Sequence, residues 1–419
     1  MKILLAVLAL TPIRHQEGDP EELFRKWEGA LQKVRSLELR FSAAALSGRE
    51  QDSFRGTLAL AEGNRVRLQV DGGSDDGRTA GAPLHRFLSD GHTLSAETTP
   101  IRTPRLRKAD PELSATLSSH LARLGVLLTA SLLKEMPLSP PSEWTRTVCV
   151  PPDHSSEDPT LRGVVFELRG PFPELSGQIR ASVTLWFPRD SDFPVLRETV
   201  VLRDGSEIGR GTERYEEWKR DADIDPASFR IPDEDLIRDV FERYRKALLD
   251  ADGAAALGAV DEATVEWYDA VLADALRVGR ADLDERSLTQ RFTILRLRIA
   301  FNRSELAAKS GREILAHAVR EGWIGRSGVE RAELGRLRVD GERAGATIQG
   351  GPDSVDAFVF TRKDGRWRVS IVESMVLAEA AFERMRTQSG LSEEEFLLQL
   401  LSRVSRTQVD ASVFEGPRE

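Results

Sequence analysis

The sequence predicts an α+β protein in two parts, a curved antiparallel sheet with helices on one side and then a second α+β domain. Before about residue 230, apolar residues alternate with the two-residue period of strands, and turns such as Glu62-Gly63-Asn64 separate the runs. After about residue 232, helical stripes come first, and strands with turns at Asp340-Gly341 and Asp364-Gly365 follow. A chain of 419 residues is also too long for one ordinary hydrophobic core.

Composition narrows the class of protein. The net charge of -9 argues against a nucleic-acid partner, because phosphate binding needs a clustered basic surface. The single cysteine, Cys149, excludes an intramolecular disulfide and leaves no cysteine cluster for a metal. We expect Cys149 to be a small buried side chain.

The first residues resemble a targeting segment. Met1-Lys2 precedes the apolar run Ile3–Leu10, so residues 1–18 are predicted to be a signal segment that directs the protein to the periplasm or cell envelope. A first β-strand or a wrongly assigned start codon are the alternatives. No other segment approaches the ~20 apolar residues of a membrane span.

In the first half, helices and strands follow one another in blocks. Asp19-Pro20 predicts a helix start, because an acidic N-cap followed by proline favours one. Strands follow from Glu38, with further turns at Asp90-Gly91 and, later in this half, at Asp204-Gly205. A leucine-rich helical region is predicted from Asp110 to about Lys134, before strands resume.

In the second half we expect three helices before a strand meander. The first begins near Asp233, the second carries Val265 and Leu272, and the third begins with a capping box of Ser310 and Glu313. Residues 374–419 are predicted to be a helical tail, whose second helix begins with a capping box of Ser392 and Glu395.

Four stretches in order carry a resemblance to a known family. The first is the opening helix and strand from Leu23 to Phe41, and the second is the strand Phe54–Leu58 with the returning strand Gly63–Leu68. The third is Leu88–Leu94, and the fourth is Thr184–Arg189 followed by Phe193-Pro194 and the closing Phe229–Pro232. On these, residues 19–232 resemble the outer-membrane lipoprotein carrier and sorting (LolA-like) proteins. The chain departs from that pattern at Ser95, where an aromatic residue is usual, and in an insert around Pro151–Asp158, which leaves lipoprotein handling itself open.

The second half resembles another fold. The closing run Phe358–Val369 is similar to the last hairpin of the NTF2-like superfamily, whose fold is a cone-shaped α+β domain. The resemblance covers residues 233–373 and indicates little about a ligand.

The LolA-like resemblance implies an unclosed half-barrel with a helical lid, and acyl chains suit such a cavity because they need area rather than directed hydrogen bonds. The alternative is a dry core between sheet and helices. The candidate wall residues are Leu58, Leu60, Val66, Leu68, Val164, Phe166 and Leu168, and the candidate lid residues are Leu121, Leu124, Leu128 and Leu132.

Motifs for catalysis are missing from the sequence. The six histidines are scattered without metal-ligand spacing, and there is no nucleophile elbow or P-loop. We therefore expect no enzyme activity, no cofactor and no metal. Pocket candidates in the NTF2-like part are Tyr244, Trp267 and Tyr268, with Asp269 nearby.

The leading hypothesis is a non-enzymatic envelope protein that binds acyl chains of a lipid or lipoprotein as a carrier or sensor. One alternative is an envelope scaffold without a lipid ligand, which docks a partner protein through the tail-helix stripe Phe396, Leu397, Leu400 and Leu401. The other is an NTF2-like enzyme, which requires a polar pocket with a perturbed acid or histidine.

Overall fold

The computed structural model describes the chain except for its first residues and several short segments. The described residues are 19–47, 50–73, 83–98, 101–134, 143–152, 156, 158–170, 179–324, 329–351 and 356–419. They form two compact units, which meet in sequence between Ile231 and Pro232. The predicted signal segment, residues 1–18, lies outside the described residues.

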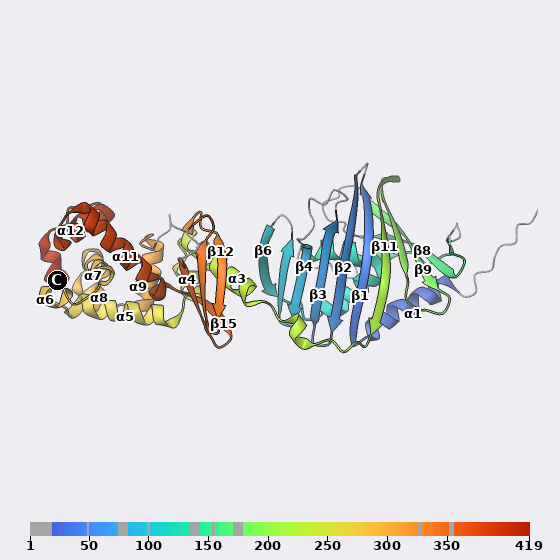
Figure 1. Ribbon diagram of the computed structural model, residues 1–419, viewed down its shortest axis with the longest axis horizontal. Coiled ribbons are helices and arrows are strands. Elements are labelled where there is room, and N and C mark those ends of the chain that lie inside the picture. Colours follow the sequence, from blue (N-terminus) through green and yellow to red (C-terminus); the bar gives the residue numbers. More distant parts are fainter. Residues whose placement is uncertain are drawn as a thin grey trace, which may run out of the picture. The chain divides into compact units, whose positions relative to one another are not determined.

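The first unit contains a sheet of 11 strands in the order β6-β5-β4-β3-β2-β1-β11-β10-β9-β8-β7, all paired antiparallel. Figure 1 shows these strands side by side. The first strand therefore pairs with the last in the middle of the sheet. The strands are β1 Ser36–Ser47, β2 Glu50–Ala61, β3 Arg65–Gly73, β4 Pro83–Asp90, β5 Thr93–Thr98, β6 Ile101–Lys108, β7 Thr145–Arg146, β8 Leu161–Arg169, β9 Ile179–Pro188, β10 Leu196–Arg203 and β11 Ser206–Arg220.

One face of this sheet, the inner face, is apolar and buried. Leu37 and Leu39 of β1 are 1 % exposed, whereas Glu38 and Arg40, which alternate with them, point to the opposite, outer face. Because side chains of a strand alternate between faces, this period of two separates a hydrophobic core from a polar surface. The predicted turns at Gly63, Asp90-Gly91 and Asp204-Gly205 are confirmed.

Two helices cover the inner face. Helix α1 (Pro20–Lys33) begins at the predicted N-cap Asp19, whose carboxylate accepts from the Glu21 amide. Its Phe24 ring lies edge-on against Phe166 of β8, and its Trp27 ring against Phe187 of β9. Helix α2 (Leu113–Lys134) contacts α1 and strands β3 and β5. The predicted α+β layout of sheet and one-sided helices is confirmed.

The second unit is also α+β. Its antiparallel sheet has the order β12-β13-β14-β15, and its turns at Asp340-Gly341 and Asp364-Gly365 are those predicted. Its helices are α3 Asp233–Leu249, α4 Gly253–Ala259, α5 Glu262–Arg277, α6 Arg280–Leu283, α7 Leu288–Ala300, α8 Arg303–Ala307, α9 Gly311–Arg320, α11 Ile371–Ser389 and α12 Glu393–Ser405. Its strands are β12 Leu334–Asp340, β13 Arg343–Ile348, β14 Phe358–Lys363 and β15 Arg366–Ser370. A short 3-10 turn, η3 Ala411–Phe414, also belongs to this unit, and another, η2 Pro226–Phe229, belongs to the first unit.

The expectation of three helices before the meander is wrong, because α4, α6, α7 and α8 also form there. Helix α7 has a capping box of Ser287 and Gln290, which is a readable local signal, but arginines interrupt its apolar stripe. The predicted capping boxes of Ser310 with Glu313 and of Ser392 with Glu395 are confirmed.

The C-terminal helices belong to the core of the second unit. Helices α11 and α12 and turn η3 all contact α7. Phe396, Leu397 and Leu401 are at most 7 % exposed, and Leu400 packs against the same core. The expectation that this stripe docks a partner protein is therefore wrong, since the unit covers it with its own side chains.

Candidate functional site

The predicted wall residues lie on the inner face, on strands β2, β3 and β8. Leu58 and Leu60 lie directly opposite Leu68 and Val66, so these four make one patch. All seven are at most 5 % exposed and belong to one hydrophobic core: Leu58, Leu60, Val66, Leu68, Val164, Phe166 and Leu168. These side chains are packed within the core of the first unit, so a guest that is to contact the inner face has to displace part of the cover above it.

The predicted lid residues lie on α2. Leu121 and Leu124 are at most 3 % exposed, and Leu128 is half-buried against the same core. Leu132 lies within α2, but its side chain is outside the described residues. The helix is broken at Gly125, whose φ of 79° and ψ of -176° belong to a region that glycine alone adopts readily.

A buried carboxylate from the sheet binds the second half of the broken helix. Glu213 of β11 is 6 % exposed and accepts from the Val126 amide at 2.9 Å and from the Leu127 amide at 3.0 Å. The Tyr215 hydroxyl donates to the same carboxylate at 2.8 Å, and burial, with Glu213 next to it, raises the pKa of Tyr215 well above its ordinary value. A negative charge at the free amides that begin a helix is stabilising.

A buried guanidinium binds the first half. Arg197 of β10, paired with Glu213 in the sheet register, is 1 % exposed. It donates to the carbonyl oxygens of Ala122, at 3.4 Å, and Arg123, which end that half of the helix. A positive charge is favourable at free helix carbonyls. Arg197 and Glu213 thus hold α2 at its break from both sides.

Both ends of α2 are also held by polar side chains. At its start, Asn64 in the β2–β3 turn donates to the Asp110 carbonyl and accepts from the Ser114 amide at 2.8 Å. At its end, Arg107 of β6 donates to the Leu133 carbonyl at 2.6 Å. The lid helix is therefore fixed to the sheet by directed hydrogen bonds at three places along its length.

The sequence analysis did not identify these anchors. A charged residue in a strand is usually exposed, so Arg197 and Glu213 were not considered for the inner face. One signal was available, because Glu213 and Tyr215 share the strand face that β11 turns towards the core. The break in the apolar run at Gly125 was a second signal.

Another ion pair ties α1 to the segment before β8. Arg146 donates two hydrogen bonds to the Glu21 carboxylate, at 2.7 and 2.8 Å, and the Cys149 amide donates a third at 2.9 Å. The Arg146 contact lowers the pKa of Glu21 to about 2. Burial raises the pKa of the Cys149 thiol to about 12, so Cys149 is the buried side chain expected from the sequence.

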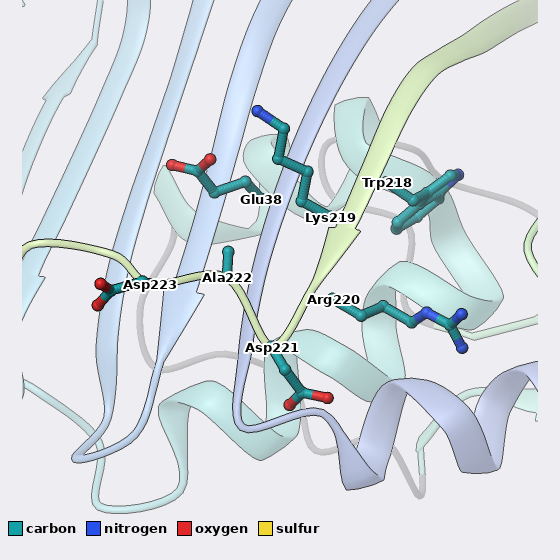
Figure 2. Close-up of a pocket in the computed structure, with 7 residues that line it drawn as sticks. All are labelled: Glu38, Trp218, Lys219, Arg220, Asp221, Ala222 and Asp223. Atoms are coloured by element: carbon teal, nitrogen blue, oxygen red, sulfur yellow. The ribbon is translucent and has the colours of Figure 1, made fainter.

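The outer face carries shallow polar hollows. Figure 2 shows one at the end of β11, where Glu38 and Lys219 project to one side while Trp218 and Arg220 point away from them. The neighbouring hollow is lined by Arg40, Thr57 and Arg67 and also by Leu39 and Leu58. Charged side chains line both hollows.

In the second unit, the pocket candidates are part of the core. Tyr244 and Tyr268 are 3 % and 5 % exposed, and burial raises the pKa of each. The Trp267 ring packs edge-on against Tyr268 with centroids 4.9 Å apart. Asp269 accepts from the Gly311 amide that begins α9, so its carboxylate stabilises a helix start.

Within the described ranges, no three histidine, cysteine, aspartate or glutamate side chains gather as a metal site would require. None of the helices in those ranges is long and apolar enough to cross a membrane.

Comparison with known proteins gave matches in structure only. No family model matches the chain, and no curated protein matches it. A putative outer membrane lipoprotein-sorting protein domain from Vibrio parahaemolyticus shares 8% identity, covering 50% of this chain and 95% of that one, with a TM-score of 0.26. A LolA superfamily protein from Nitrosomonas europaea shares 11% identity, covering 51% of this chain and 98% of that one, with a TM-score of 0.25. MucB in its complex with MucA from Pseudomonas aeruginosa shares 12% identity, covering 52% of this chain and 62% of that one, with a TM-score of 0.25. At such TM-scores these structures carry no argument, and the function has to be argued from the chain's own geometry.

Proposed function

We propose that the first unit is a non-enzymatic binding domain of the bacterial envelope, which takes up acyl chains of a lipid or lipoprotein between its inner face and α2. The observation that carries the proposal is the attachment of α2. Its leucines lie on an apolar sheet face, while Asn64, Arg107, Arg197 and Glu213 fix its position.

Exchange of α2 for an acyl chain keeps much of the hydrophobic burial, because both cover the face with hydrocarbon. Each buried methylene is worth about 0.8 kcal/mol, so a long chain offsets much of the burial that Leu121 and Leu124 give up. The break at Gly125 lets the two halves of α2 move as separate short helices. The polar anchors then define the closed position to which α2 returns.

We further propose that residues 233–373 are an NTF2-like module for a second ligand or for docking. The carrier and sensor roles differ only in what happens to the bound chain. Supporting the non-enzymatic assignment, Tyr244, Tyr268 and Asp269 are all used in packing or helix capping.

The test is a series of fluorescent fatty acids of increasing length, titrated into the purified full-length chain, with mass spectrometry of co-purified lipid. If the acyl chain of the fatty acid lies on the apolar face, the binding affinity rises by about fourfold for each added methylene, the equivalent of about 0.8 kcal/mol. Absence of binding, or affinity that does not change with chain length, contradicts the proposal.

A matched pair of variants tests the role of α2. Glu213→Gln weakens the anchor at the helix break, so we expect faster uptake of the fatty acid. Glu207→Gln, on the same strand, changes only a surface contact with Arg210 and leaves uptake unchanged. Equal uptake rates for both variants would show that α2 does not have to move.

The scaffold alternative rested on the apolar stripe of α12, which no longer supports it. The stripe on α12 is buried in its own unit, so it offers no surface for a partner protein.

A further inference from the structure

A separate hollow of about 460 Å³ opens on the sheet towards the ends of β1, β2, β3 and β11. Its size lies within the roughly 300–1,000 Å³ of small-molecule sites. Most of its lining residues alternate along their strands with residues of the buried core, so they belong to the outer face. Ala43 and Phe54, which belong to or pack against the apolar core, also line it, so the hollow reaches the rim of the inner face.

Two arginines stand on either side of a serine in this hollow. In the sheet register, Ser42 of β1 lies directly opposite Arg55 of β2 on one side and Arg214 of β11 on the other. Neighbouring strands lie about 4.8 Å apart, so the two arginine backbones are roughly 10 Å apart with their side chains on the same face. Guanidinium groups on such long side chains can reach one anion above Ser42.

The floor between the arginines consists of small side chains. One step further along the strands, Ala44 lies opposite Ser53 and Thr212. All three line the hollow together with Ser42. The floor therefore offers hydroxyl donors and leaves room above them.

The lining of the hollow carries more positive than negative charge. Asp71, the acid in the lining, lies directly opposite Arg55 in the sheet register, and it accepts from the Gln69 amide with both oxygens, at 3.0 and 3.3 Å. Among the described residues, neither Arg55 nor Arg214 makes an ion pair or donates a side-chain hydrogen bond. The two arginines and Asp71 together leave one net positive charge in the lining.

Two other basic residues of the same face lie near acidic side chains. Arg67 lies 3.8 Å from Glu38, and Lys219 lies 3.6 Å from Glu217. Arg55 and Arg214 make no such contact among the described residues.

We propose that this hollow binds a phosphoryl group, carried either by a soluble phosphate compound or by a lipid headgroup. A tetrahedral oxyanion accepts from two planar guanidinium groups and from hydroxyls at once, and arginine is the side chain best suited to such contacts. The proposal does not depend on acyl-chain binding, because Arg55, Arg214 and Ser42 lie on the outer face of the sheet.

The test uses the full-length chain in two assays, calorimetric titration with inorganic phosphate and co-sedimentation with vesicles. Vesicles of phosphatidylcholine alone are compared with vesicles that also contain phosphatidic acid. Arg55→Gln and Arg214→Gln are each expected to weaken binding about tenfold, as expected for loss of one charge-assisted contact. Arg105→Gln is the control, because Arg105 is an exposed arginine on the distant edge strand β6 and is not part of the hollow.

Binding of free phosphate that both variants weaken supports a soluble ligand, and binding only to phosphatidic acid vesicles with the same dependence supports a headgroup. No binding in either assay overturns the proposal. Equal binding by the Arg55→Gln, Arg214→Gln and Arg105→Gln variants also overturns it, because general surface charge would then account for the signal.

Discussion

Replacing Gly125 by alanine tests whether the break in α2 is required by the anchors around it. A Cβ atom at this position would lie 2.7 Å from both carboxylate oxygens of Glu213 and 2.8 Å from Cδ of Arg197. Neither side chain can move away freely, since Glu213 binds the amides of Val126 and Leu127. The positive φ of 79° adds backbone strain for any residue with a Cβ.

The expected loss of stability follows from these two terms. Backbone strain of this kind costs about 1–3 kcal/mol, and forcing an extra methyl group into a packed site costs about 1–3 kcal/mol. A middle value of about 4 kcal/mol lowers the Tm of a domain of this size by roughly 8–16 °C. Differential scanning calorimetry of the full-length chain measures the shift.

Gly29→Ala provides the matched control. Gly29 lies inside helix α1 of the same unit, and no other atom lies within 4 Å of its Cβ position. Alanine in a helix interior is favoured over glycine by about 0.5–1 kcal/mol, so this variant unfolds at the same or a slightly higher temperature. If both variants unfold at the same temperature, α2 does not need a glycine at its break, and the account of the anchors is wrong.

Three further predictions concern charged and reactive groups of the first unit. Glu213→Gln raises the hydrogen-exchange rate of the Val126 and Leu127 amides about tenfold, because a neutral acceptor holds them less strongly; unchanged exchange would mean that the charge is not needed. Cys149, with its pKa raised to about 12, reacts slowly with a thiol reagent at pH 8 in the native chain and quickly in guanidinium, whereas fast native labelling would contradict its burial. Glu21, whose folded pKa of about 2 lies below its ordinary 4.5, contributes stability above pH 4.5 that is lost as the pH falls towards 2. Glu21→Gln therefore unfolds more easily than the native chain at neutral pH by about 1–3 kcal/mol, and in urea titrations the difference should vanish near pH 2.

The local features of the fold could be predicted from the sequence because each depends on neighbouring residues. The N-cap at Asp19, the turn at Asp204-Gly205 and the capping box at Ser392 each need a few positions in a row. The strand period also placed Leu58 and Val164 correctly on a buried face.

Features that depend on distant residues were missed. Strand β6 contains Pro104 among arginines, and it forms an edge of the sheet, where proline is tolerated. Glu213 and the Val126 amide are 87 residues apart, so only the folded sheet brings them together. Helix α7 was missed because Arg291, Arg296 and Arg298 interrupt its apolar pattern, although Arg298 is buried and donates to four backbone carbonyls.

The pairing of β1 with β11 has a consequence for how the first unit folds. Leu37 is aligned with Arg220, so the middle of the sheet joins the two ends of the unit's sequence. Strands β1 to β6 and β8 to β11 each form a meander of sequential neighbours, which can assemble early from nearby residues. Closing the central seam requires almost the entire unit to have been synthesised, and its loop-closure entropy makes it a slow step. During translation one edge of β1 therefore stays unpaired. Glu213 of β11, whose carboxylate binds α2, reaches its position only when β11 pairs with that edge.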